Sequence, residues 1–257
     1  MLISEVIANL NTYAPEFIAD SWDNVGLQVG DENAEASKIL LTLDVDIDVL
    51  KEALEIGANL VVTHHPLIFK PISSITDEAL VFAIKNNIAI FTMHTNLDWA
   101  TDGINDSFAR LLGLESIEPI RRNDDNGACM GRFGSLKNSM SAHEFIKFIK
   151  QKLGCEVLKH SRLTQDVGVK IKRVGVCGGA GDEFLAECIE QKCDAFVTSD
   201  VHYHLAKEAY SKGILLIDAG HFETESLVLK PLSNWLATWF NGVEVAAKCK
   251  NYWEYKL

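Results

Sequence analysis

Short apolar runs alternate along the chain with segments whose apolar residues recur at helical spacing. Residues 38–45, KILLTLDV, form one such run, and the runs ANLVVTHHP and IAIFTMH (88–94) follow. Asp46 or Asp48 can cap a helix after the first run, and Gly57 suits the C-terminal end of that helix. Strands that alternate with helices predict an α/β fold with helix-covered sheets.

The rest of the chain continues this pattern. A helix is predicted within residues 4–20, broken or bent by Pro15, and another runs from Asp102 toward Gly113. Ser141 and Glu144 match a capping box, and the helix that follows should end at Gly154. The charged turn RRNDDNG (121–127) is the predicted boundary between lobes of residues 1–122 and 123–257.

The second half of the chain repeats the first. KILLTLDVDIDVLKEALEIGANLVVTHH (38–65) corresponds to KRVGVCGGAGDEFLAECIEQKCDAFVTSD (172–200), and both segments have a Val-Thr pair near the end of the second strand. The next strands lead to His94-x-x-x-Asp98 and to His221-x-x-x-Glu225. Generic α/β units resemble one another, but the matching endings favour duplication of a β-α-β unit.

Composition narrows the function. The chain has 257 residues, 47% of them hydrophobic and 23% charged, which is typical of a soluble globular protein. Its formal charge of −12, without a Lys/Arg cluster, argues against a nucleic-acid partner. The sequence contains no apolar stretch long enough to predict a membrane span. Its N-terminus lacks the pattern of a signal peptide. The six scattered cysteines are expected to be reduced, and a cytoplasmic location follows.

Candidate chemistry gathers where the strands end, which is where open α/β sheets bind ligands. The side chains in question are His64 with His65, His94 with Asp98, and His221 with Glu225. Histidine with carboxylate suits Zn, Mn, Fe, Co or Ni, and the sequence does not select among these metals. So many ligands fit two divalent ions better than one, with the carboxylates as bridges.

The adjacency of His64 and His65 is unusual, because neighbouring residues of a strand point to opposite faces. If the strand ends before them, both rings can project over the sheet edge, and Pro66 holds the preceding residue extended. The alternative is that one ring is a core histidine bonded to a carbonyl group. Each His-x-x-x-carboxylate pair is a weak motif on its own, since surface helices show it without a metal.

Three further segments have open interpretations. In SDVHYH (199–204), Asp200 aligns with His65 in the repeat. His202 and His204 could be ligands, proton shuttles or residues that orient the ligating rings, or the segment could be the capped start of a helix. GGAGDEF (178–184) could cradle an anion or form a tight turn, but it matches no phosphate-binding motif. Trp22, with Asp23 and Asn24, could contact a planar ligand or simply pack.

Six motifs, in this order along the chain, resemble those of the GTP cyclohydrolase 1 type 2 homologs, also called Nif-three-like or YbgI-like proteins. The motifs, which span about residues 20 to 230, are SWDNVGLQVG, LTLDV, VVTHHPLIF, HTNLD, VCGGAG and GHFETE. The resemblance implies two similar α/β lobes with a dinuclear metal centre in the cleft between them. Its ligands carry over to His64, His65, Asp98, His221 and Glu225.

The resemblance also places His94 beside the ligands and implies a ring-shaped homohexamer, a trimer of dimers. An extra domain found between the lobes of some members is expected to be absent here. Two classes of function stay open. One is a metal-dependent hydrolase acting on a nucleotide or phosphorylated small molecule, with His94 or His204 as proton shuttle. The other is a non-catalytic metal carrier, sensor or regulatory protein, so whether the chain is an enzyme is itself open.

Overall fold

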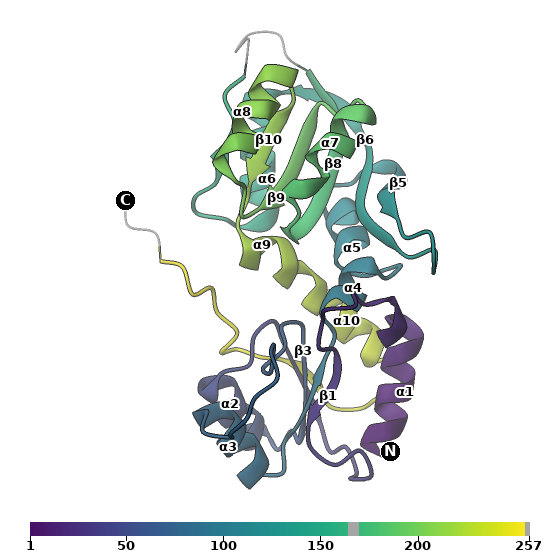
Figure 1. The fold of residues 1–257 in the computed structure, drawn as a ribbon, viewed down its shortest axis with the longest axis vertical. Coiled ribbons are helices and arrows are strands. Elements are labelled where there is room, and N and C mark those ends of the chain that lie inside the picture. The colour runs from purple at the N-terminus through teal and green to yellow at the C-terminus, as the bar shows by residue number, and fades with distance from the viewer. Residues whose placement is uncertain (164–169, 255–257) are drawn as a thin grey trace. The chain divides into compact units, whose positions relative to one another are not determined.

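A computed structural model describes residues 1–163 and 170–254 of the chain (Figure 1). The chain forms two compact units. The first consists of residues 1–100 and 228–250, and the second of residues 101–227 with the C-terminal residues from 251 onward. The division into lobes of residues 1–122 and 123–257 stays a prediction. In the structure the chain passes from the first compact unit to the second after Ala100, and it returns to the first after Leu227.

The first unit is built on a five-stranded sheet with the order β1-β4-β3-β2-β11. The strands β2, β3, β4 and β11 run parallel, and β1 pairs antiparallel with β4 at the edge. The strand bounds are Gly26–Val29 (β1), Ile39–Thr42 (β2), Leu60–Thr63 (β3), Ala89–Thr92 (β4) and Val243–Val245 (β11). β2, β3 and β4 are buried at every position, as expected for parallel strands covered on both faces.

The helices of the first unit include the two that the sequence predicts, one within residues 4–20 and one after residue 46. They are α1 (Ile3–Tyr13), α2 (Ile47–Ile56), α3 (Glu78–Lys85), α4 (Thr95–Trp99) and α10 (Leu229–Leu236). Asp46, not Asp48, caps α2, because its carboxylate accepts the N–H groups of Asp48 and Val49, each at 2.9 Å. Gly57 ends α2 in the left-handed conformation, at φ 75°. The apolar face of α2 packs on buried Leu40 and Val61.

The second unit is built on a six-stranded mixed sheet with the order β5-β6-β8-β9-β10-β7. β8, β9 and β10 are parallel, whereas the long hairpin β5–β6 and the short edge strand β7 are antiparallel to their neighbours. The strand bounds are Glu115–Arg122 (β5), Cys129–Ser141 (β6), Lys159–His160 (β7), Lys170–Ala180 (β8), Ala195–Ser199 (β9) and Leu215–Asp218 (β10).

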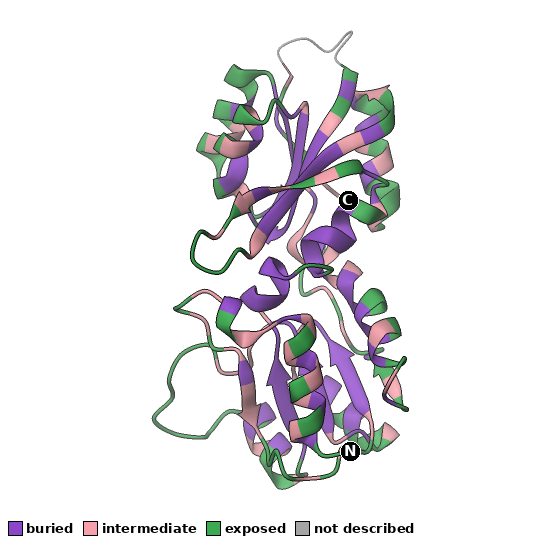
Figure 2. Cartoon of the chain, turned by 90° about the vertical axis from the view of Figure 1, so that its right-hand side faces the viewer, coloured by how far each residue is buried: buried purple, intermediate pink, exposed green. Residues whose placement is uncertain are grey.

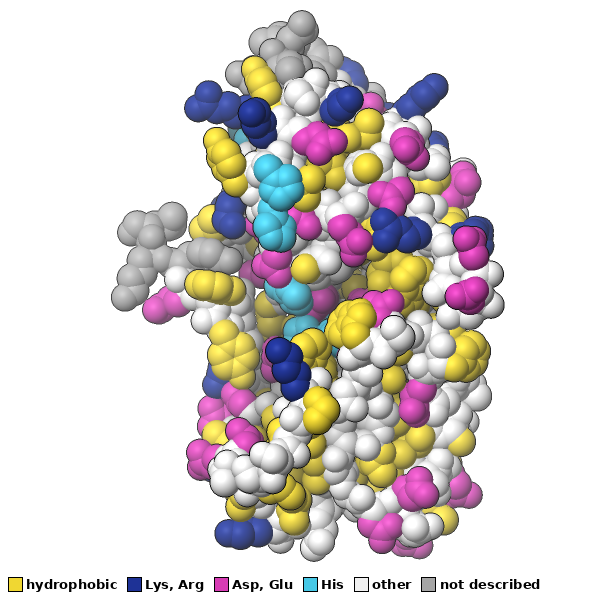
Figure 3. All heavy atoms as spheres, in the orientation of Figure 1, with side chains coloured by type: hydrophobic (Ala, Val, Ile, Leu, Met, Phe, Trp, Pro, Cys, Tyr) yellow, Lys and Arg dark blue, Asp and Glu magenta, His cyan; other side chains and the backbone are white. Residues whose placement is uncertain are grey.

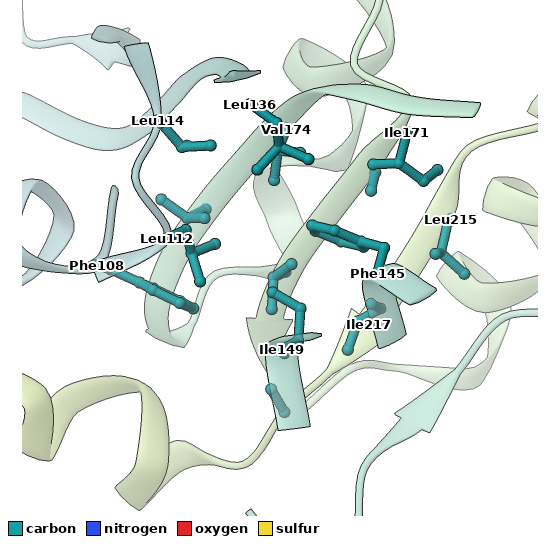
Figure 4. Close-up of a cluster of buried hydrophobic side chains, with 14 of the residues drawn as sticks. Phe108, Leu112, Leu114, Leu136, Phe145, Ile149, Ile171, Val174, Leu215 and Ile217 are labelled. Atoms are coloured by element: carbon teal, nitrogen blue, oxygen red, sulfur yellow. The ribbon is translucent and has the colours of Figure 1, made fainter. Parts of the chain in front are cut away.

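The helices of the second unit cover an apolar core on this sheet. They are α5 (Ile104–Leu111), α6 (Ala142–Leu153), α7 (Leu185–Glu190), α8 (Tyr203–Lys212) and α9 (His221–Glu225). The predicted capping box is present, with Ser141 and Glu144 bonding reciprocally at the start of α6. Phe145 and Ile149 then project from α6 onto Val174 and Ile217 of the sheet (Figure 4). In Figure 2 the strands are buried along most of their length.

The α/β fold predicted from the sequence is confirmed. Each unit contains three adjacent parallel strands, β2-β3-β4 or β8-β9-β10, with an antiparallel strand beside the last of them. This shared topology is what an internal duplication would give, although the duplication itself stays a prediction. In the parts of the chain that the structure describes, no helix combines the length and the hydropathy needed to cross a bilayer. Acidic side chains are spread over the face shown in Figure 3, with basic ones among them.

Candidate metal centre

Three threonines end the parallel strands β2, β3 and β4 of the first unit, and two of them bond to the loops beyond. Thr42, Thr63 and Thr92 are in register on β2, β3 and β4, and all three are buried. The Thr42 hydroxyl donates to the Asp44 carbonyl at 2.7 Å, and the Thr63 hydroxyl donates to the Leu43 carbonyl at 2.9 Å. The chain therefore leaves the sheet in fixed directions at the point where the histidines follow.

His64 and His65 come directly after the end of β3, as predicted. They lie in a bend, so the alternation of a strand no longer applies to them. Their backbone N–H groups still donate to the carbonyls of Thr42 at 3.2 Å and Leu43 at 2.8 Å, which holds the bend against the neighbouring strand end. The two rings lie 4.9 Å apart, centroid to centroid, on the same side of the bend.

His94, which follows β4, brings a third ring into the group. Its centroid lies 5.2 Å from that of His64 and 5.7 Å from that of His65. One ring nitrogen of each histidine lies within 4.8 Å of the other two. The first unit thus gathers three imidazoles closely enough to share one cation or a pair of cations.

All three rings are held through Nδ1. His64 donates from Nδ1 to the Met93 carbonyl, His65 Nδ1 is bonded to Asp44 Oδ1, and His94 Nδ1 is bonded to Asp23 Oδ1, each at 2.8 Å. An acceptor at Nδ1 fixes the neutral tautomer in which Nε2 carries the lone pair. Metal-binding histidines are oriented in this way by carbonyl or carboxylate groups, so the support of these rings matches that of a ligand set.

Asp23 is the most strongly held of these supporting groups. Its second oxygen, Oδ2, accepts the Thr95 N–H at 3.0 Å and the Thr95 hydroxyl at 2.6 Å. Burial raises the pKa of Asp23, but the hydrogen bonds and charge of His94 and the bonds from Thr95 outweigh burial and lower the pKa to about 2. Asp23 therefore stays ionised at neutral pH and holds the proton of His94 on Nδ1.

Asp98 adds a carboxylate to the same group. It lies on α4, four residues after His94, and only 9% of it is exposed. A carboxylate oxygen of Asp98 lies within 4.8 Å of a ring nitrogen of His64. A buried carboxylate needs a cation or hydrogen bonds to offset the loss of hydration, so its burial beside an imidazole fits the predicted role as a ligand.

His221 and Glu225 begin and end α9 in the second unit. The four-residue spacing puts them on one face, with His221 Nε2 3.1 Å from Glu225 Oε1. His221 Nδ1 is bonded to Asp200 Oδ2 at 2.6 Å. Burial lowers the pKa of His221, but the bonds and charges of Glu225 and Asp200 outweigh burial and raise it to about 9. The surroundings of this ring therefore favour a positive charge.

The glycine-rich segment after Cys177 packs against α9 and offers no anion cradle. Its amides are already bonded, Gly178 N–H to Asn105 Oδ1, Gly179 N–H to Thr224 Oγ1 and Gly181 N–H to Thr198 Oγ1, each at 3.0 Å. A Cβ on Gly179 would overlap Glu225 Oε1. The tight-turn interpretation fits this geometry, since the glycines let the strand approach the helix that carries Glu225.

His202 and His204 lie on the exposed surface at the start of α8. The His202 ring nitrogen Nδ1 and backbone N–H both bond to Asp182 Oδ2 at 2.8 Å. These bonds fix the residue that directly precedes α8. The His204 ring lies 5.7 Å from that of His202, centroid to centroid. The proton-shuttle role assigned to His204 from the sequence stays a prediction.

Two exposed aromatic rings flank His94. Trp22 lies 6.0 Å and Phe69 6.4 Å from the His94 ring, and they lie 5.9 Å from each other. Side-chain bonds join the two segments, because Asn24, two residues after Trp22, donates from Nδ2 to the Ile68 carbonyl, and Gln28 of β1 accepts the Ile68 N–H at 2.9 Å. Trp22 is 59% exposed, which leaves one side of its ring open to a ligand.

Sequence reasoning missed the supporting role of Asp44 and left those of Asp23 and Asp200 open. Asp44 and Asp200 each stand one or two residues beyond a buried strand, the same position that singled out the histidines. That position is therefore a usable signal for both residues. Asp23 lies 71 residues from His94 in the sequence, and no local spacing connects them.

Comparisons with known proteins identify the family of the chain. A model of the Duf34/NIF3 (NGG1p interacting factor 3) family matches residues 1–251. The chain is 34% identical over 250 residues to a GTP cyclohydrolase 1 type 2 homolog of Lactococcus lactis, with 95% of each chain covered. A protein of the same name from Campylobacter jejuni is 36% identical over 232 residues, covering 88% of each chain.

Solved structures match the whole chain. The Staphylococcus aureus protein SA1388 superposes with a TM-score of 0.93 at 28% identity, covering 100% of this chain and 99% of the other. Reduced HcgD from Methanocaldococcus jannaschii superposes with a TM-score of 0.79 at 30% identity, covering 96% and 98%. The sequence resemblance and the fold thus lead to the same group of proteins.

Proposed function

Because the chain belongs to the Duf34/NIF3 family, we propose that it is a dinuclear metal-binding protein and a metal-dependent hydrolase. The observation that carries the proposal is the cluster of three imidazoles in the first unit, each oriented by an acceptor at Nδ1. Core histidines need only one such bond each, and they have no reason to gather with one ring nitrogen of each within 4.8 Å of those of the other two.

The donor set fits borderline divalent metals. Imidazole nitrogen with carboxylate oxygen suits Zn, Fe, Mn, Co or Ni, whereas Mg and Ca prefer sites made of oxygen alone. The proposed ligands are His64, His65 and Asp98 of the first unit and His221 and Glu225 of the second. The raised pKa of His221 supports its inclusion, because surroundings that hold a proton also favour a metal cation.

Bound divalent ions would supply Lewis acidity and a water molecule of lowered pKa. The residues of the chain then have to orient the ligand rings and move protons. His94 is suited to the second task, since Asp23 holds one proton at its Nδ1 and leaves Nε2 to accept another. His204 is the weaker candidate for proton transfer because it lies on the exposed surface of α8.

A nucleotide or another phosphorylated small molecule is the proposed substrate class. The name shared by the relatives, GTP cyclohydrolase 1 type 2 homolog, refers to hydrolysis of a purine nucleotide. Trp22 and Phe69 support a planar substrate, because aromatic rings beside His94 can stack on a heterocycle. Asn24 and Gln28 bond to Ile68, the residue before Phe69, and these bonds keep the two aromatic segments together.

Metal analysis of the purified protein tests the metal site. Two divalent ions per chain are expected, and replacing His64 and His65 together with alanine should abolish most of the binding. His143→Ala is the matched control, because His143 is exposed on α6 and belongs to neither ligand set. Metal content unchanged in the double variant would refute the site, and one ion per chain would refute the dinuclear centre.

Turnover by the metal-loaded protein tests the hydrolase. GTP, other nucleotides and generic phosphodiesters form the panel, and activity should vanish in Asp98→Ala and in Glu225→Ala. His94→Ala should keep its metal and lose the rate, with a changed pH profile, if it transfers protons. Two bound metals with no turnover across the panel would overturn the hydrolase and leave the alternative, a carrier, sensor or regulatory protein.

The assembly and location are part of the same proposal. The family resemblance supports a homohexamer, which light scattering coupled to size-exclusion chromatography measures directly. A cytoplasmic location is supported by the six cysteines, which are all free thiols, as is usual in a reducing compartment. A monomer at micromolar concentration would contradict the hexamer.

A further inference from the structure

The second unit contains a pocket that the proposed metal ligands do not line. Its volume is about 740 Å³, within the range of small-molecule sites. β7 and the residues after it line it on one side and α8 on the other, and Leu216 and Asp218 of β10 complete the lining. α8 lies beside β10 in Figure 1.

α8 turns an aromatic stripe toward this pocket. Tyr203, Ala206, Lys207 and Tyr210 all line it, at the i, i+3, i+4, i+7 spacing of one helix face. A face with this spacing normally packs on the core. Here Tyr203 is 88% exposed and Tyr210 is 44% exposed, whereas Ala209 is the buried residue of the helix. The stripe therefore offers two ring faces to a planar ligand.

The charges around the pocket favour an anion. Lys159, Arg162 and Lys207 line it, and Asp218 is the one carboxylate among the lining residues. Asp218 is itself engaged, by Lys159 Nζ at 3.1 Å and by the Gly220 N–H at 3.4 Å. In a chain whose formal charge is −12, a pocket lined by three cations and one carboxylate, which leaves Arg162 and Lys207 beyond the Lys159–Asp218 pair, differs from the surface as a whole.

The wall opposite α8 is rigidly attached to the sheet. Ser161 is 4% exposed, its N–H donates to the Leu216 carbonyl at 2.8 Å, and its hydroxyl accepts the Leu216 N–H at 3.0 Å. This exchange continues the β7–β10 pairing by one step. Lys159 and Arg162, on either side of Ser161, are thus carried by a fixed backbone, which favours a preformed site.

We propose that this pocket binds a small molecule that joins a phosphate group to a planar aromatic body. The phosphate lies among Arg162, Lys207 and Lys159, where charge-assisted bonds form. The planar body stacks on Tyr203 and Tyr210. The site uses neither metal nor metal ligands, so it does not rest on the proposed hydrolase function.

Binding of AMP to the metal-stripped protein, followed by isothermal titration calorimetry, tests the proposal. Adenosine and inorganic phosphate, each carrying half of the ligand, should bind at least about tenfold more weakly than AMP. Arg162→Ala with Lys207→Ala should weaken AMP binding by at least about tenfold, and Tyr203→Ala should weaken it as well. Affinity should also fall with added salt.

Lys212→Ala is the matched control, because it removes an exposed cation from the same helix outside the pocket. It should leave AMP affinity unchanged. The His64→Ala, His65→Ala double variant should also keep AMP binding, and loss of binding there would assign AMP to the metal centre instead. Adenosine as tight as AMP, full affinity in the Arg162 and Lys207 variant, or no saturable binding would each overturn the proposal.

Discussion

The two units place different chemistry on the same arrangement of parallel strand ends. The first unit presents three imidazoles and a carboxylate, and each imidazole is oriented by an acceptor at Nδ1. The second unit presents one imidazole, His221, bonded to two carboxylates that raise its pKa to about 9. The imidazoles of the first unit are oriented so that they can donate lone pairs, whereas the carboxylates of the second unit offset a positive charge.

The means of support differ too. In the first unit, side chains on loops orient the rings, as Asp23 and Asp44 do. In the second unit, Glu225 depends on the close approach of Gly179, and the Gly178 N–H is bonded to Asn105 on α5. We therefore expect substitutions around the histidines of the first unit to change metal affinity more than stability. Substitutions around Glu225 in the second unit should change stability more than metal affinity.

The largest effect on folding is expected for Arg132→Met. Arg132 is 4% exposed and binds Asp106 of α5 through two bonds, Nε to Oδ1 at 2.7 Å and Nη2 to Oδ2 at 2.8 Å. The variant leaves the Asp106 carboxylate buried without its cation, which costs about 3–5 kcal/mol in the free energy of unfolding. Urea denaturation of the metal-free protein measures this loss.

An exposed ion pair next to the same helix provides the control. Arg110 and Asp102 are both more than half exposed, so Arg110→Met should cost less than about 1 kcal/mol. Equal losses for Arg132→Met and Arg110→Met would contradict the view that the buried pair anchors α5 to β6 in the second unit.

The ends of β2, β3 and β4 could be predicted from the sequence because the local signals are strong there. β2, β3 and β4 are fully apolar up to a final threonine, and Asp46, Gly57 and the Ser141–Glu144 capping box set helix ends by local geometry. The long hairpin β5–β6 was not predicted, because its partly exposed β5 lacks a clear alternation of apolar and polar residues.

The residues that orient the histidine rings were harder to predict than the gathering of the histidines. The histidines stand at recognisable positions after strands, but Asp23 reaches His94 across 71 residues, and only the fold brings them together. The return of residues 228–250 to the first unit is likewise a long-range event. β11 joins β2 through pairs such as Val243 with Ile39, a contact that no short-range pattern reveals.

Gly179→Ala should have the next largest effect on folding. Gly179 has φ +62° and an added Cβ would overlap Glu225 Oε1, so strain and overpacking both contribute, about 2–4 kcal/mol together. Gly213→Ala is matched for backbone strain, since Gly213 has φ +74° but nothing within 4 Å of the added atom. The excess loss in Gly179→Ala, measured by thermal unfolding, is the contribution of the approach to Glu225. Equal losses would show that this approach is unimportant.

Asp44→Asn should weaken metal binding with little loss of folding. An amide can donate as well as accept, so the change relaxes the tautomer of His65, at a cost of about 10- to 100-fold in metal affinity. Asp23→Asn is the matched comparison, because Asp23 holds His94, which is not among the proposed ligands, and it should leave metal affinity nearly unchanged. Competition with a chromophoric chelator measures both affinities, and unchanged affinity in Asp44→Asn would contradict the role assigned to this carboxylate.

Asp23 also gives a pH dependence with a definite sign. Its folded pKa of about 2 lies below the ordinary value of 3.8, so its contribution to stability is present above about pH 4. That contribution is lost as the pH falls through about 2. Asp23→Asn should therefore flatten the acid limb of the stability curve of the metal-free protein, and an unchanged acid limb would contradict the lowered pKa.

The smallest effect is expected for Asp200→Asn, which removes one of the two carboxylates bonded to His221. Asp200 is 54% exposed, so solvent screens its charge, and the pKa of His221 in the metal-free protein should fall by less than about one unit from about 9. A raised pKa stabilises the fold below about pH 6.5, and this stability is lost as the pH rises through about 9. NMR titration of the His221 ring follows the change, with Glu190→Gln as an exposed control. A larger fall than in Glu225→Gln would reverse the order of the two carboxylates.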